Sequence, residues 1–142
     1  MRILAIDPGK TAGVAWYDSA HQSFRSWERE DRVAVVQYVE HLASEFAIDL
    51  VVCESFVPRP GVRTWQPDAL ETIGALRYVC SRAGVPFDTQ SPADAKRFST
   101  NEKLTALGWR NPTPGGHADD AARHLLLAAV RHVAIDPERF TD

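Results

Sequence analysis

Residues 3–13, Ile-Leu-Ala-Ile-Asp-Pro-Gly-Lys-Thr-Ala-Gly, decide the fold that we predict for the whole chain. The apolar run over residues 3–6 predicts a strand buried on both faces, and Pro8 and Gly9 predict a turn directly after it. Asp7 therefore stands where the strand leaves its sheet, and a carboxylate is costly to bury there unless a cation or hydrogen bonds hold it. Asp-Pro-Gly alone would also suit a turn-capping aspartate, so the interpretation depends on whether further acids reach the same place.

The bulk composition predicts one soluble domain over residues 1–142. A hydrophobic content of 44% and a charged content of 25% are ordinary for a globular protein of this length. No stretch approaches the roughly 20 apolar residues of a membrane helix, and the N-terminus lacks a signal-peptide pattern. Cys53 and Cys80 have no metal-binding spacing, which favours free thiols in a reducing cytosol. We expect no membrane partner.

Positive charge is concentrated in the middle of the chain. Residues 55–110 carry 8 basic and 5 acidic side chains, a net charge of +3, whereas the whole chain has a net charge of -3. The overall charge argues weakly against a nucleic-acid partner, but this distribution leaves room for one.

Hydrophobic periodicity and turn residues predict an α/β fold. The expected strands cover residues 3–6, 13–17, 23–28, 48–53 and 85–89, and the expected main helices cover 32–46, 67–82 and 117–133. Asp31 and Ser91 are the expected N-caps, and Gly84 the expected end of the second helix. This order predicts a mixed five-stranded sheet flanked by helices, with Asp7 and Glu54 at the carboxyl ends of central strands.

A third group of ligand-type side chains begins the last predicted helix. His117, Asp120 and His124 are spaced i, i+3 and i+7, which places them along one helical face. Together with Asp7 and Glu54, His117 and Asp120 would form an oxygen-rich site with one imidazole. That set suits Mg²⁺ or Mn²⁺ better than a structural zinc site.

Two neighbouring residues compete for places in that site. Asp119 is rotated by about 100° from Asp120 on a helix, so we expect it to face solvent. We expect His124 to pack in the core or to support a ligand residue rather than to bind metal itself.

Four segments, in order along the chain, carry a resemblance to a known family. They are Ile3-Leu-Ala-Ile-Asp-Pro-Gly, Val52-Cys-Glu-Ser-Phe, Ser91-Pro-Ala-Asp-Ala-Lys-Arg-Phe and His117-Ala-Asp-Asp-Ala-Ala. They resemble the motifs of RuvC-like Holliday-junction resolvases, which belong to the ribonuclease H-like superfamily. The short length is more similar to the phage-encoded branch, and between the motifs the likeness is thin.

The resemblance implies a ribonuclease H-like fold and a metal-dependent endonuclease that cleaves branched DNA by two-metal-ion hydrolysis. Asp7, Glu54 and Asp120 take the positions of metal ligands, and His117 takes a position where the family has either Asp or His. Mg²⁺ would be the cofactor, with Mn²⁺ as a substitute. The resemblance also implies a homodimer paired through the helix over residues 67–82, in a bacterial or phage-infected host cytosol. The apolar pattern of that helix would equally suit a fully packed core helix.

The predicted DNA contacts come from the basic middle of the chain. The resemblance implies phosphate contacts for Lys96 and Lys103, and Phe56 lies near the position of an aromatic that enters the junction in the family. A loop peculiar to this chain adds three candidates that could contact phosphate or stack on a base, namely Arg59, Arg63 and Trp65. Trp65 could equally cover the end of a helix.

Other functions share parts of this pattern. An RNA–DNA hybrid nuclease would use a similar metal core, and a non-cleaving module that binds branched nucleic acid could keep the fold. The Asp-x-Gly motif also resembles the first phosphate motif of actin-like ATPases, but those enzymes need two such domains around a nucleotide, which 142 residues cannot supply.

Overall fold

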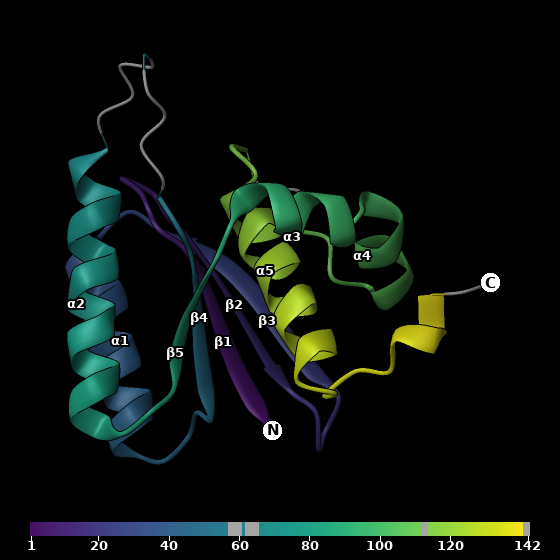
Figure 1. Ribbon diagram of the computed structural model, residues 1–142, viewed down its shortest axis with the longest axis horizontal. Helices are drawn as coiled ribbons and strands as arrows, with labels where there is room; N and C mark the ends of the chain where they lie inside the picture. Colours follow the sequence, from purple (N-terminus) through teal and green to yellow (C-terminus); the bar gives the residue numbers. More distant parts are fainter. Residues whose placement is uncertain (57–60, 62–65, 112–113, 141–142) are drawn as a thin grey trace.

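The computed structural model contains one mixed sheet of five strands in the order β3-β2-β1-β4-β5 (Figure 1). The strands are β1 (Arg2–Asp7), β2 (Ala12–Asp18), β3 (Ser23–Arg29), β4 (Leu50–Glu54) and β5 (Phe87–Gln90). The first three strands pair antiparallel, whereas β4 pairs parallel with both β1 and β5. The structure describes residues 1–56, 61, 66–111 and 114–140. The predicted mixed five-stranded sheet is confirmed.

Helices cover both faces of this sheet. One face carries α1 (Arg32–Ser44) and α2 (Pro67–Ala83), and the other carries α5 (His117–Arg131) with the short helices α3 (Pro92–Phe98) and α4 (Asn101–Leu107) (Figure 1). A 3₁₀ turn, Pro137–Phe140, follows α5. No helix within the described ranges is long and apolar enough to cross a membrane.

The strand predicted to be buried on both faces is β1. Leu4 and Ile6 pack into the core under α1 and α2, while Ile3 and Ala5 pack into the core under α5, and all four are fully buried. Because successive side chains of a strand alternate between faces, an unbroken apolar run serves two cores at once.

The predicted helix caps are confirmed, but the starts of two strands are not: β4 begins at Leu50 rather than at Ile48, and β5 also begins later than expected. The Asp31 side chain accepts from the backbone N–H groups of Val33 and Ala34, and Gly84 ends α2 in the left-handed conformation at φ 71°. The fifth strand begins at Phe87 rather than at Val85. The reason is that the Val85 N–H closes the end of α2 on the Cys80 carbonyl, at 2.9 Å, and is not available to the sheet.

The start of β2 contacts the start of α5 without any intervening side chain. A Cβ atom on Gly13 would lie 1.8 Å from the carbonyl oxygen of His117, which no real Cβ can do. Glycine at this position therefore lets the first turn of α5 approach the sheet. The same approach places His117 beside the end of β1.

Candidate active site

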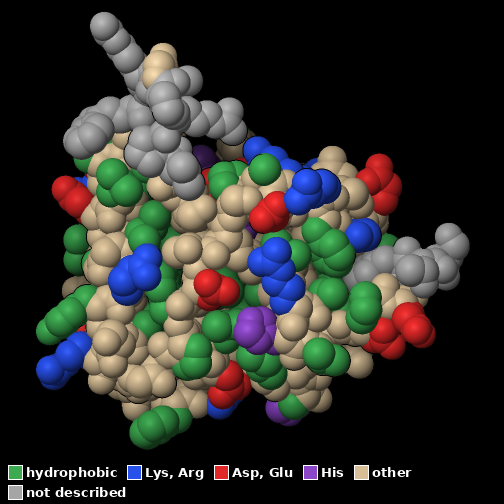
Figure 2. Space-filling model, in the orientation of Figure 1, with side chains coloured by type: hydrophobic (Ala, Val, Ile, Leu, Met, Phe, Trp, Pro, Cys, Tyr) green, Lys and Arg blue, Asp and Glu red, His purple; other side chains and the backbone are tan. Residues whose placement is uncertain are grey.

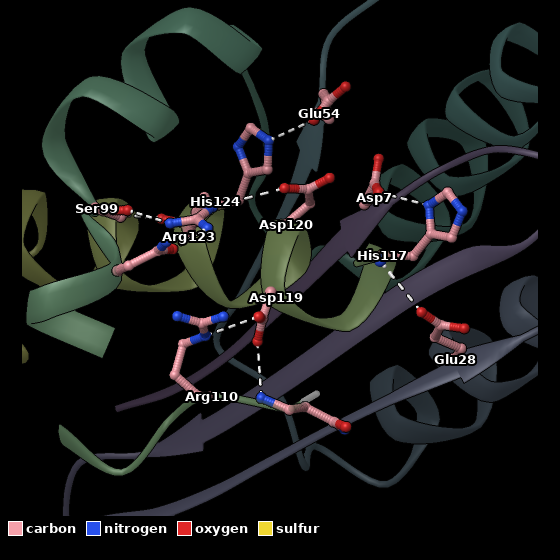
Figure 3. Close-up of polar contacts among 12 residues, drawn as sticks. Asp7, Glu28, Glu54, Ser99, Arg110, His117, Asp119, Asp120, Arg123 and His124 are labelled. Atoms are coloured by element: carbon pink, nitrogen blue, oxygen red, sulfur yellow. Dashed lines mark hydrogen bonds and ion pairs between the residues drawn. The ribbon is translucent and has the colours of Figure 1, made fainter. Parts of the chain in front are cut away.

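The four predicted ligand residues line one cleft. Asp7 and Glu54 end the neighbouring parallel strands β1 and β4, and His117 and Asp120 lie on the first turn of α5 (Figure 3). The cleft has a volume of about 540 Å³, and the β1–β2 turn and the start of α2 complete its walls. The structure thus brings together residues from three segments that are far apart in the sequence.

Asp7 is the most electrostatically strained group of this cleft. Its pKa is raised from 3.8 to about 7, mainly by burial and to a smaller extent by the nearby carboxylates of Glu54 and Asp120. A hydrogen bond with His117 acts in the opposite direction. Three mutually repelling carboxylates around a partly buried position would be relieved by a cation.

Each acid is paired with a different basic group in this structure. His117 Nδ1 lies 3.2 Å from Asp7 Oδ2, His124 Nε2 lies 2.8 Å from Glu54 Oε2, and Arg123 Nε lies 3.6 Å from Asp120 Oδ1 (Figure 3). Across the part of the chain that the structure describes, no three His, Cys, Asp or Glu side chains are grouped closely enough to hold a metal ion together. The cleft therefore has oxygen donors suited to a hard cation, with their charges turned toward protein partners.

A glutamate from the edge strand fixes the start of α5. The N-cap residue of this helix, Gly116, has no side chain, and the backbone N–H of His117 instead donates to Glu28 Oε1 at 3.1 Å. A carboxylate is favourable at a helix N-terminus. Sequence reasoning missed this contact, because nothing near residue 28 indicates that β3 will pass the start of α5.

Asp119 does not face solvent, and that expectation was wrong. It is buried on the side of α5 away from the cleft, where Oδ2 accepts from Arg110 Nε at 2.9 Å and Oδ1 accepts from the Asn111 backbone N–H at 2.7 Å. Asn111 in turn donates to the Ser26 carbonyl of β3 at 3.0 Å. Asp119 therefore joins the segment before α5 to the sheet edge, and it lies outside the group that lines the cleft.

His124 packs in the core, which is one of the two positions expected for it. The ring is buried in the core, with Nε2 directed at Glu54 and Nδ1 lying 3.0 Å from Oε1 of Gln90. Gln90 ends β5 opposite Glu54 and had not been singled out as a site residue from sequence.

Comparison with known proteins gives matches at the level of structure alone. No family model matches the chain, and no curated protein matches it. The structure of Thermus thermophilus RuvC in complex with a Holliday junction substrate aligns at a TM-score of 0.65 and 18% identity, covering 94% of this chain and 96% of that chain. The fowlpox virus Holliday junction resolvase aligns at a TM-score of 0.55 and 14% identity, covering 94% and 99%. The yeast mitochondrial Holliday junction resolvase Ydc2 aligns at 0.51 and 16% identity, covering 89% and 75%.

The chain has a RuvC-like fold. This RuvC-like fold was expected from the four motifs, and it spans nearly the whole chain.

The predicted DNA-contacting residues of this RuvC-like fold fall into different settings. Lys96 is exposed on α3, and Phe56 is half-buried just after β4. Lys103 on α4 donates from Nζ to the Phe98 carbonyl at 2.8 Å and lies 3.9 Å from the centre of the Phe98 ring. Figure 2 shows Lys and Arg side chains over the region of α3 and α4, with acidic side chains among them. Arg59, Arg63 and Trp65 lie outside the described residues, so their contacts stay predictions.

Proposed function

We propose that the chain is a metal-dependent endonuclease that cleaves phosphodiester bonds in branched DNA, including Holliday junctions. The observation that carries this proposal is the meeting of Asp7, Glu54, His117 and Asp120 in one cleft of a RuvC-like fold. The solved structures that share this fold include the fowlpox virus and yeast mitochondrial Holliday junction resolvases and a RuvC bound to a Holliday junction substrate. We propose that residues 1–142 act as a single nuclease domain.

Asp7, Glu54, Asp120 and His117 are the residues that would hold the metal. The raised pKa of Asp7 supports this assignment, because the group is held in a place where its negative charge lacks compensation. Mg²⁺, for which Mn²⁺ would substitute, would supply Lewis-acid stabilisation of negative charge on the phosphate. The carboxylates themselves would repel a phosphate, so the same residues make cleavage depend on the cation.

We propose that DNA is bound mainly outside the acidic cleft. Lys96 is exposed on the α3 side of the molecule and would contact phosphate, and we propose the same for Lys103. Phe56 lies two residues after Glu54, which ends β4, and it is the described aromatic nearest in sequence to the Glu54 end of the cleft. We also propose a homodimer, in which two copies of the cleft would face the two strands of one junction.

The decisive experiment compares substrates and metal together. Purified protein is incubated with end-labelled four-way junction, flap, duplex and RNA–DNA hybrid, each with Mg²⁺ or with EDTA. We expect Mg²⁺-dependent cleavage of the branched DNAs and no more than background cleavage of plain duplex. Preferential cleavage of the hybrid would establish a ribonuclease H-type activity instead, and binding without cleavage of any substrate would establish a non-cleaving module.

Glu54→Gln separates chemistry from binding. Removal of this charge should reduce Mg²⁺-dependent cleavage by at least about 10²-fold, whereas affinity for the junction should be unchanged or higher because a phosphate-repelling charge is lost. Electrophoretic mobility shifts in Ca²⁺ measure the binding. If the folded variant lost binding as well as cleavage, Glu54 would have a structural role and the site assignment would be wrong.

A further inference from the structure

The buried side chains behind the cleft form a connected chain of three residues. Glu54 and Gln90 lie opposite each other at the ends of the parallel strands β4 and β5. His124 reaches both from α5, with Nε2 at 2.8 Å from Glu54 Oε2 and Nδ1 at 3.0 Å from Gln90 Oε1. We infer that His124, oriented by Gln90, holds the Glu54 carboxylate in the rotamer in which it can bind a cation. This inference rests on the proposed function, since it assigns a supporting role to residues behind the proposed metal site.

The hydrogen-bonding capacities of the three groups define this arrangement. A carboxylate accepts only, so the shared proton with Glu54 is on His124 Nε2. In a neutral imidazole Nδ1 then accepts, and the Gln90 amide donates to it after a half-turn that exchanges its oxygen and nitrogen. Glu54 thus sets the tautomer of His124, and Gln90, which can donate or accept, anchors the other ring nitrogen and with it the orientation of the ring.

Burial explains why such a chain controls geometry. His124 is 1% exposed and Gln90 is 3% exposed, whereas the Glu54 side chain is 25% exposed. The two supporting groups are therefore fixed by packing, and Glu54 alone extends from them toward the cleft. Figure 3 shows the second carboxylate oxygen of Glu54 turned away from His124. One oxygen is held by the protein, which leaves the other for a ligand.

An apolar side chain would fill the space of His124 without the cost of burying a polar ring. His124 lies among buried Leu and Ala residues of α5, and every buried side-chain polar atom of the described residues has a hydrogen-bond partner. Because His124 is buried and uses one ring nitrogen to hydrogen-bond the Glu54 carboxylate, we assign it as a positioning residue for that carboxylate.

Two replacements at His124 distinguish positioning from packing. In His124→Gln the side-chain amide nitrogen occupies the region of Nε2 and can still donate to Glu54. In His124→Asn the shorter amide lies near Nδ1, so the hydrogen bond to Gln90 can persist while the donor to Glu54 is lost. Metal binding is measured without DNA, as the Mg²⁺ concentration that gives half of the maximal rise in melting temperature. Melting in EDTA reports the structural cost of each variant separately.

We expect His124→Asn to raise the half-effective Mg²⁺ concentration by about 10–100-fold and His124→Gln to change it by less than about 3-fold. An equal half-effective Mg²⁺ concentration for wild type and His124→Asn would overturn the inference while leaving the proposed nuclease in place. The absence of any Mg²⁺-dependent rise in the melting temperature of wild type would instead overturn the proposed metal-dependent function itself.

Should His124→Asn fail to fold, Gln90→Met decides the question. This substitution keeps the side-chain volume and removes the amide, so we expect the half-effective Mg²⁺ concentration to rise about 10-fold. An unchanged concentration would contradict the inference.

Discussion

Asp7 makes the metal-free protein less stable than it could be. Its pKa is raised from 3.8 to about 7 by burial first and by the neighbouring carboxylates second, so the folded chain binds this proton more tightly than the unfolded chain does. The contribution of Asp7 to the free energy of unfolding therefore falls as pH rises from about 4 to about 7. Above pH 7 that loss is complete, and a bound cation would offset it.

Replacing Asp7 by its neutral isostere should therefore stabilise the metal-free protein while removing cleavage. In EDTA at pH 8 we expect Asp7→Asn to gain at least about 1 kcal/mol, or roughly 3–5 °C in melting temperature for a chain of this size. The gain should shrink as pH is lowered and disappear near pH 4. Thermal melts of wild type and variant between pH 4 and pH 8 measure this difference.

Asp18 provides a control with the opposite sign. It lies at the far end of the sheet from Asp7, and the hydrogen bond from His21 lowers its pKa. Its charged form is thus favoured in the folded chain, so Asp18→Asn should lower the melting temperature at pH 8 rather than raise it. If Asp7→Asn also lowered it, the three carboxylates would not repel one another in the folded protein.

The residues of the cleft could be predicted from sequence, but most of their partners could not. Asp7, Glu54 and His117 could be predicted as site residues because they stand at strand ends and at a helix start, and such positions lie together at one edge of the sheet. Glu28 and Gln90 carry no such signal, since each becomes important only through the side chain that packs beside it. Tertiary contacts of this kind depend on relative placement of elements, which periodicity does not contain.

At the scale of elements, the contact between β2 and α5 determines whether His117 and Asp120 reach the cleft. Gly13→Ala would place a methyl group against the His117 carbonyl, so the first turn of α5 must move away from the sheet. We expect a loss of about 1–3 kcal/mol in the free energy of unfolding. We also expect Mg²⁺-dependent cleavage to fall in the folded protein, because the helix start carries two of the proposed ligands. Denaturant unfolding and cleavage of a four-way junction measure the two effects.

Gly9→Ala is the matched control for this substitution. It changes a glycine in the same β1–β2 connection, but the added methyl would contact only the Thr11 carbonyl oxygen, at 3.4 Å. We expect its free energy of unfolding to stay within about 0.5 kcal/mol of wild type. If both variants lost the same free energy of unfolding, glycine would be needed for the flexibility of the connection and not for the close approach of α5.

The elements themselves were predictable where local chemistry determines them. Asp31, Gly84 and Ser91 mark helix boundaries through contacts within a few residues, and all three boundaries are confirmed. Asp119 shows where this reasoning fails. Helical rotation correctly separates it from Asp120, but rotation alone does not reveal that Arg110 and Asn111 fold back to cover that side of α5.

At the scale of the whole molecule, DNA affinity should depend on the face that carries α3. Lys96→Ala should weaken junction binding and reduce the slope of log affinity against log salt by about 1, as expected for one lost phosphate contact. Arg82→Ala is the control, because Arg82 is also exposed but lies in the last turn of α2, whereas the cleft is lined by the start of that helix. Fluorescence anisotropy at several salt concentrations measures both. A slope that changes equally in the two variants would place the DNA elsewhere or show only an effect of net charge.

The exposed side of α2 is where we expect a second copy of the chain to bind. Leu70, Gly74 and Tyr78 follow one another at every fourth residue, and Leu70 and Tyr78 are 40% and 66% exposed. Apart from its chain neighbours and the backbone of its own helix turn, no atom of the described residues lies within 4 Å of where a Gly74 Cβ would be, so two helices could approach closely at this point. Gly74→Glu should therefore prevent dimerisation by placing a charge in the middle of the contact.

The same substitution should leave the protomer folded, because glutamate is favoured over glycine in a helix by roughly 0.5–1 kcal/mol. Loss of the dimer would then not be a consequence of unfolding. Ala106→Glu on α4 is the control, since it adds the same charge at an exposed helical position on another face. Light scattering should give a dimer for wild type and Ala106→Glu and a monomer for Gly74→Glu. A junction presents two strands to be cut, so we expect the monomer to cut one strand at a time. In a supercoiled plasmid that carries a cruciform, single-strand cuts give open-circle product, whereas paired cuts give linear product. A Gly74→Glu dimer that still linearises the plasmid would exclude α2 as the interface.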